Sequence, residues 1–95
     1  MQKRSDKDHR VQITESQLRD AEQTVEFWLR RRLDEKGWGA WVSRHEILGF
    51  LTEEYTEMTE AVHSKSEQEI RAELVDIAVG CEFAIACINA DALDW

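Results

Sequence analysis

Two pairs of acidic residues are the part of this sequence most suited to chemistry. Glu54 and Glu57 are three residues apart, and so are Glu73 and Asp76. Residues at this spacing share one face of a helix. Both pairs lie at the margins of apolar stripes, where a charge is costly unless something cancels it. Four converging carboxylates without basic partners are typical of a site for a hard divalent cation, with magnesium first and manganese as an alternative.

The helices that carry these pairs are expected to form an antiparallel hairpin. The first pair lies in the second half of a helix predicted over residues 44–63, and the second pair lies in the first half of a helix predicted over residues 67–89. A hairpin would therefore bring both pairs to the same height. Bundle cores build di-metal carboxylate sites in this manner. No histidine occupies a matching position, which favours an oxygen-preferring ion over iron or zinc.

A repeated start signal predicts three helices. Each signal is a Ser or Thr followed three residues later by Gln or Glu, which is the pattern of a capping box. The pairs are Thr14 with Gln17, Ser43 with Glu46, and Ser66 with Glu69. The corresponding helices are expected over residues 15–34, 44–63 and 67–89. The sequence has no proline, which agrees with an all-α fold.

Length and composition limit the rest. The 95 residues are enough for one domain, expected over residues 13–95 after a flexible N-terminal arm of residues 1–12. The net charge of −8 argues against a nucleic-acid-binding surface. Cys81 and Cys87 point to different faces of one predicted helix, so we expect them to stay reduced. No stretch resembles a membrane span or a secretory signal. We therefore predict a cytoplasmic protein.

The predicted helix 67–89 is apolar almost all round between Leu74 and Ile88. Such a helix must be covered on every side. If its face bearing Leu74 and Cys81 packs inside the chain, its face bearing Val79 and Phe83 is left exposed. A second copy of the chain is the expected cover, which predicts a helical bundle completed by homo-oligomerisation. The helix before it is expected to bury Ile47, Leu48, Leu51, Tyr55, Met58 and Val62.

Two segments together resemble a known family. TEEYTEMTEA at residues 52–61 and ELVDIA at residues 73–78 resemble the EExxE…ExxD signature of the MazG-like all-α nucleotide pyrophosphohydrolases. The resemblance covers about residues 20–90. It implies a four-helix bundle of MazG-like type that forms dimers or dimers of dimers. It also implies magnesium-dependent hydrolysis of a nucleoside or deoxynucleoside triphosphate to monophosphate and pyrophosphate.

The resemblance assigns roles to individual acids. Glu54, Glu57, Glu73 and Asp76 would hold the metal. Glu53 would be the auxiliary catalytic acid that accepts a proton from the attacking water, although it can equally be a solvated glutamate. The alternative function is a non-catalytic, metal-dependent nucleotide-binding or interaction protein on the same helical scaffold.

Four further residues are candidates for binding the nucleotide. Trp38 and Trp41 can stack on a base or, instead, close the end of the bundle. Arg32, in the run Arg30 to Arg32, can bind phosphate oxygens or complement the helix dipole. His45 can contact the ligand or a neighbouring subunit, or can lie on the surface. The sequence has no basic residue after Arg71, where the family often places a phosphate contact.

Overall fold

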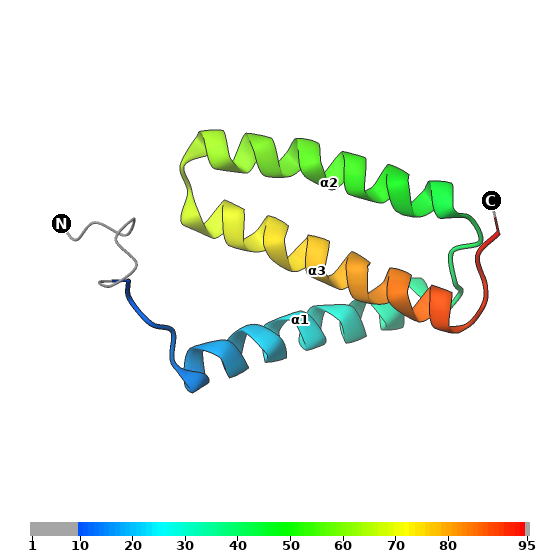
Figure 1. The fold of residues 1–95 in the computed structure, drawn as a ribbon, viewed down its shortest axis with the longest axis horizontal. Helices are drawn as coiled ribbons and strands as arrows, with labels where there is room; N and C mark the ends of the chain where they lie inside the picture. Colours follow the sequence, from blue (N-terminus) through cyan, green and yellow to red (C-terminus); the bar gives the residue numbers. More distant parts are fainter. Residues whose placement is uncertain (1–9, 95) are drawn as a thin grey trace.

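The computed structural model describes residues 10–94, and this part of the chain holds three helices and no strand (Figure 1). The helices are α1 (Glu15–Lys36), α2 (Arg44–Ser64) and α3 (Glu67–Asn89). α2 and α3 form an antiparallel hairpin, and α1 packs against α3, so that α3 is the central helix. The all-helical prediction is confirmed. Most of the predicted N-terminal arm lies outside the described residues.

The helices begin at the predicted residues. At the start of α1, the Gln17 N–H donates to Thr14 Oγ1 at 3.1 Å and the Thr14 N–H donates to Gln17 Oε1 at 2.8 Å, which is a complete capping box. Ser66 accepts from the Glu69 N–H at 3.2 Å. Ser43 begins α2 by accepting from the N–H of His45. These caps satisfy backbone donors that have no partner within a helix.

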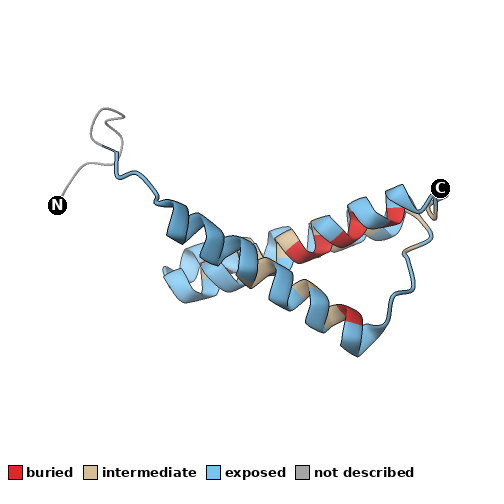
Figure 2. Cartoon of the chain, turned by 90° about the horizontal axis from the view of Figure 1, so that it is seen from below, coloured by how far each residue is buried: buried red, intermediate tan, exposed pale blue. Residues whose placement is uncertain are grey.

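The core lies where the C-terminal ends of α1 and α3 meet. Leu33, Phe83 and Cys87 are buried there, and Trp41 packs against them from the loop that joins α1 to α2. The rings of Trp41 and Phe83 meet edge to face with centroids 5.1 Å apart. Figure 2 shows the buried residues following one side of α3 and reappearing near the end of α1. Trp41 therefore closes the end of the bundle, as one of its two interpretations predicted.

The prediction of which residues are buried was wrong in part for α2. Leu48, Leu51, Tyr55 and Val62 are exposed, with Tyr55 73% accessible. Ile47 and Met58 are half-buried. The physical reason is that α2 packs on α3 alone. Its far side therefore has no partner within the described part of the chain.

The prediction of which face of α3 is left exposed was also wrong. Val79 and Phe83 are buried, whereas Leu74, Ile85 and Ile88 are exposed. An all-round apolar helix can offer either face to its neighbours, and here α1 covers the face that bears Phe83. α3 still exposes large apolar side chains, as expected, but on the face opposite to the predicted one. No helix among the described residues is both long and apolar enough to cross a membrane.

Candidate metal centre

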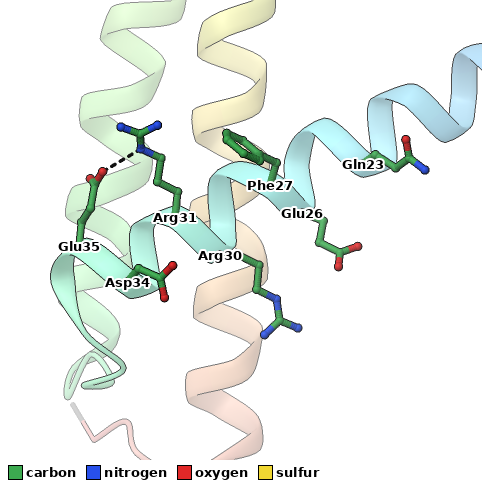
Figure 3. Close-up of a pocket in the computed structure, with 7 residues that line it drawn as sticks. All are labelled: Gln23, Glu26, Phe27, Arg30, Arg31, Asp34 and Glu35. Carbon is green, nitrogen blue, oxygen red and sulfur yellow. Dashed lines mark hydrogen bonds and ion pairs between the residues drawn. The ribbon is translucent and has the colours of Figure 1, made fainter.

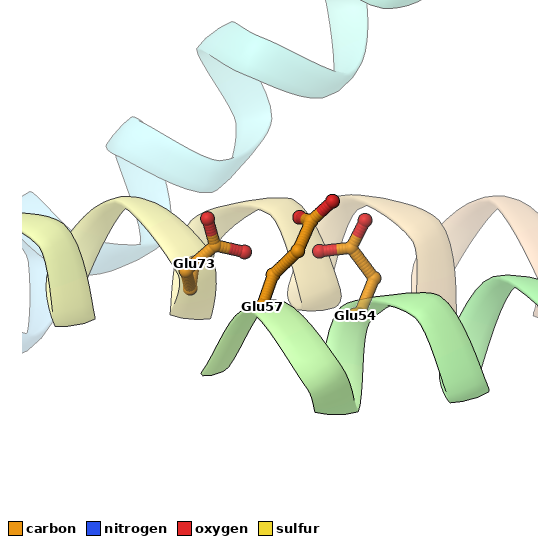
Figure 4. Close-up of side chains that lie close together, drawn as sticks. All are labelled: Glu54, Glu57 and Glu73. Atoms are coloured by element: carbon orange, nitrogen blue, oxygen red, sulfur yellow. The ribbon is translucent and has the colours of Figure 1, made fainter. Parts of the chain in front are cut away.

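Three carboxylates converge between α2 and α3. One carboxylate oxygen from each of Glu54, Glu57 and Glu73 lies within 4.8 Å of the other two. Figure 4 shows the two glutamates of α2 and the one of α3 turned toward a common point. We call these three residues the carboxylate cluster. The antiparallel hairpin brings the acidic residues of its two helices to one height, as the sequence predicted.

Among residues 10–94, no base forms an ion pair with the carboxylate cluster. The Oε2 atoms of Glu54 and Glu73 are buried and have no hydrogen-bond partner. The ion pairs found among residues 10–94 involve other acids, namely Glu15, Glu35 and Asp20. Buried oxygens that carry charge and lack a donor are costly. A cation bound by these oxygens would remove that cost.

Crowding and burial raise the pKa of these acids. Burial is the largest cause that raises the pKa of Glu54, from an ordinary 4.5 to about 7, followed by the charge of Glu57 and a hydrogen bond with Glu73. Two carboxyl groups can share such a hydrogen bond only when one of them is protonated. The pKa of Glu57 is raised by burial and then by Glu73. Charge repulsion within the carboxylate cluster therefore destabilises the folded state when all three acids are ionised.

Asp76 lies beside the carboxylate cluster and is not one of its three converging residues. It is exposed, and its shorter side chain does not bring an oxygen into the group. Partial desolvation of its carboxyl group by the neighbouring helix, and then the charge of Glu57, raise the pKa of Asp76, so the two carboxylates are near each other. Asp76 also lines the same cavity as Glu54. Its place is at the edge of the centre, within reach of a ligand held there.

Glu53 is exposed on α2, next to Glu54 in the chain. Its charge is one of the smaller causes of the raised pKa of Glu57, after burial and Glu73. The Glu53 carboxylate is therefore close enough to raise the pKa of Glu57, although Glu53 is not one of the three converging residues. This position fits either of its two interpretations, a proton acceptor or a solvated glutamate.

A cavity of about 350 Å³ opens beside the carboxylate cluster, where α1 faces the hairpin. Glu54 and Asp76 line one wall. The facing wall comes from α1, and its polar and aromatic residues are Trp28, Arg31, Arg32, Glu35 and Lys36. Sequence analysis missed Trp28 and Lys36 as part of a site. Trp28 lies one helical turn from Arg31 and from Arg32, and Lys36 lies one turn from Arg32, which is the signal that would have grouped them.

The nucleotide-binding candidates are divided between several places. Arg32 lies at this cavity, with its guanidinium 4.9 Å from the ring centroid of Phe83 and 5.5 Å from that of Trp41. Trp38 is 69% exposed and lines a separate cavity of about 340 Å³ beside Cys87. His45 is exposed in the first turn of α2. The structure therefore groups only Arg32 with the acids.

The donor chemistry of the carboxylate cluster suits a hard cation. All three converging groups offer oxygen, and neither cysteine nor histidine belongs to the group. Such a donor set is preferred by magnesium, manganese and calcium over zinc or copper. Comparison with known proteins adds no relative to this geometry, because no protein-family model, no curated protein and no solved structure matches the chain.

Proposed function

We propose that this protein is a magnesium-dependent nucleotide pyrophosphohydrolase of MazG-like type. Its substrate would be a nucleoside or deoxynucleoside triphosphate, and its products the monophosphate and pyrophosphate. The observation that carries the proposal is the convergence of Glu54, Glu57 and Glu73, with two buried oxygens that have no partner. These residues occupy the acidic positions of the EExxE…ExxD signature that the sequence resembles.

Each acid has a role that its position supports. Glu54, Glu57 and Glu73 would hold the cation through their converging oxygens, and Asp76 would complete the set from the edge of the cavity. Bound magnesium supplies charge neutralisation of the triphosphate and a lowered pKa for the attacking water. Glu53 is exposed and adjacent, and it is our candidate to accept the proton of that water.

A second copy of the chain would complete the bundle. The exposed apolar residues of the hairpin are Leu48, Leu51, Tyr55 and Val62 on α2, and Leu74, Ile85 and Ile88 on α3. At about 100° per residue they form one stripe on each helix, and both stripes fall on the side of the hairpin away from α1. We call this surface the apolar face. An exposed apolar surface of this kind is typical of protein interfaces, and a homo-oligomer would cover it.

A non-catalytic, metal-dependent nucleotide-binding protein is the second candidate. The exposure of Glu53 favours it, because a general base normally lies within hydrogen-bond reach of its substrate. Under this alternative the carboxylate cluster would still bind a metal and a nucleotide. It would release no pyrophosphate.

The deciding experiment is an assay of pyrophosphate release. The protein would be incubated with a panel of nucleoside and deoxynucleoside triphosphates, with magnesium and with a chelator. We expect release of pyrophosphate and monophosphate from at least one substrate, dependent on magnesium. Binding of triphosphates without release of pyrophosphate would favour the second candidate. A protein that neither binds nor hydrolyses any of these triphosphates would refute both candidate functions.

A further inference from the structure

Opposite charges line two sides of one cavity without pairing across it. The α1 side of the cavity of about 350 Å³ holds Arg31, Arg32 and Lys36 together with one acid, Glu35, which pairs with Arg31, and the other side holds Glu54 and Asp76. Among the described residues no ion pair joins the two sides. The cavity therefore separates the bases of α1 from Glu54 and Asp76 and leaves space for a ligand between them. A ligand that fits must present positive charge to the acids and negative charge to the bases.

Arg31 is held in place for such a ligand. Its Nε donates to Glu35 Oε1 at 2.8 Å (Figure 3). Its guanidinium lies 5.4 Å from the ring centroid of Trp28. The two terminal nitrogens make no hydrogen bond or ion pair within residues 10–94. A planar group with fixed orientation and free donors is suited to phosphate oxygens.

Arg32 is engaged differently. Its guanidinium lies over the rings of Phe83 and Trp41, which belong to the core region. Arg32 is also half-buried, whereas Arg31 is exposed and the ring beside it, Trp28, itself lines the cavity. Arg31 and Lys36 are therefore the better candidates for contacting a ligand. This shifts the expected phosphate contact from Arg32, which the sequence suggested, to its neighbours on α1.

We infer that Arg31 and Lys36 bind the polyphosphate end of a nucleotide whose metal ion is held by the carboxylate cluster. The inference rests on the proposed function and names the residues that take the phosphates. A metal–polyphosphate complex carries both charges that the cavity requires. Polyphosphate alone would be repelled by Glu54 and Asp76, so metal and polyphosphate should strengthen each other's binding. All the bases that line this cavity belong to α1.

The test compares two double variants with the same loss of charge on the same helix. Arg31→Gln with Lys36→Gln removes the bases of the cavity. Arg19→Gln with Arg30→Gln removes two charges of α1 outside it, since Arg19 pairs with Glu15 and Arg30 projects from α1 in another direction than Arg31 (Figure 3). Binding of inorganic tripolyphosphate in the presence of Mn²⁺ is measured by calorimetry, and binding of Mn²⁺ alone by electron paramagnetic resonance.

We expect the cavity variant to weaken tripolyphosphate binding by at least about tenfold, because it loses two charged donors. Its affinity for Mn²⁺ alone should be unchanged or higher. The control variant should stay within about twofold of the unaltered protein, because its lost charges are exposed and screened. Equal tripolyphosphate binding by the cavity variant and the unaltered protein would overturn the inference, and so would an equal loss in the control variant.

The same measurements separate this inference from the proposed function. An unaltered protein that releases no pyrophosphate, together with a cavity variant that loses tripolyphosphate, would support the binding site and refute the hydrolase. Hydrolysis together with unchanged tripolyphosphate binding by the cavity variant would refute the binding site alone. A nucleoside triphosphate should bind more tightly than tripolyphosphate. The reverse order would overturn the nucleotide as the source of the polyphosphate.

Discussion

Gly80 of α3 lies directly against the ring of Phe50 of α2, and a Cβ at position 80 would overlap three atoms of that ring. Each of these residues is one helical turn from an acid of the centre, Phe50 from Glu54 and Gly80 from Asp76. Phe50 also lines the cavity beside the carboxylate cluster. The close approach of α2 to α3 at this point therefore sets the spacing at which the carboxylates meet.

Gly80→Ala should lower the free energy of unfolding. In an open helical position alanine is favoured over glycine by about 0.5–1 kcal/mol. Here the added methyl group must displace Phe50, and overpacking of this kind costs about 1–3 kcal/mol. Gly49→Ala is the matched control, because nothing lies within 4 Å of a Cβ at that position on α2. Urea denaturation should show the control to be more stable than the unaltered protein. A Gly80→Ala variant that gained as much would contradict the close packing.

The sequence was sufficient to predict the helices and the acids that meet. Thr14 and Gln17 form the expected capping box, and Glu54 and Glu73 come together as their helix positions required. These features depend on local chemistry and on the periodicity of one helix. Such information is contained in short stretches of sequence.

The packing partner of each helix face could not be predicted in the same way. Between Leu74 and Ile88 α3 is apolar almost all round, so its periodicity could not show whether Phe83 or Ile85 would be covered. The structure buries Phe83 against the end of α1 and leaves Ile85 exposed. Trp28 of α1 lies at the cavity that faces the hairpin. The crossing of α1 over the hairpin decides both outcomes, and no local pattern encodes that crossing.

Divalent cations should raise the melting temperature. Mg²⁺ or Mn²⁺ bound by Glu54, Glu57 and Glu73 would relieve their repulsion and would stabilise the folded state by mass action. Differential scanning fluorimetry with increasing Mg²⁺ should show a rising midpoint, and the Glu73→Gln variant should respond less. Sodium chloride of the same ionic strength is the control for screening. A midpoint that responds equally to both salts would count against a metal site.

The metal-free protein should lose stability as pH rises. The pKa of Glu54 is raised from 4.5 to about 7 in the folded state, so between these values the folded state binds more protons than the unfolded state. The stabilising effect is complete below pH 4.5 and is lost as pH passes about 7. The raised pKa values of Glu57 and Asp76 act in the same direction.

This pH dependence can be measured by urea denaturation in a chelator. The free energy of unfolding should be higher at about pH 5 than at about pH 8. Glu54→Gln should flatten that difference, because glutamine does not titrate, and Mg²⁺ should restore stability at the higher pH. An identical pH profile in the unaltered protein and in Glu54→Gln would show that the raised pKa is not coupled to folding.

Removing a carboxylate of the cluster should abolish most of the hydrolysis. Glu54→Gln and Glu73→Gln keep the shape of the side chain and remove a charged ligand. Turnover should fall by at least about a hundredfold, or about 3 kcal/mol of barrier. The metal-free fold should be at least as stable, because repulsion is reduced. Glu60→Gln is the control, since Glu60 is exposed and lies outside the three converging residues. If Glu60→Gln lost as much turnover as Glu54→Gln, the carboxylate cluster would not be the catalytic site.

The apolar face should hold copies of the chain together. Leu51 on α2 and Ile85 on α3 are both exposed there, and a charge at either position would be buried in an interface that covers them. Leu51→Asp and Ile85→Asp should therefore dissociate the oligomer while helical content is kept. Val11→Asp is the control, because Val11 is exposed outside the three helices.

Light scattering at micromolar concentration measures the assembly directly, and circular dichroism reports the helices. Val79→Asp should behave differently from the variants of the apolar face, because Val79 is buried within one chain and a charge there should unfold it. A Val79→Asp variant that kept its helices and only dissociated would move the interface to the opposite side of α3. A stable monomer of 11.1 kDa that still releases pyrophosphate would refute the oligomer, because the apolar face would then be exposed in the active protein.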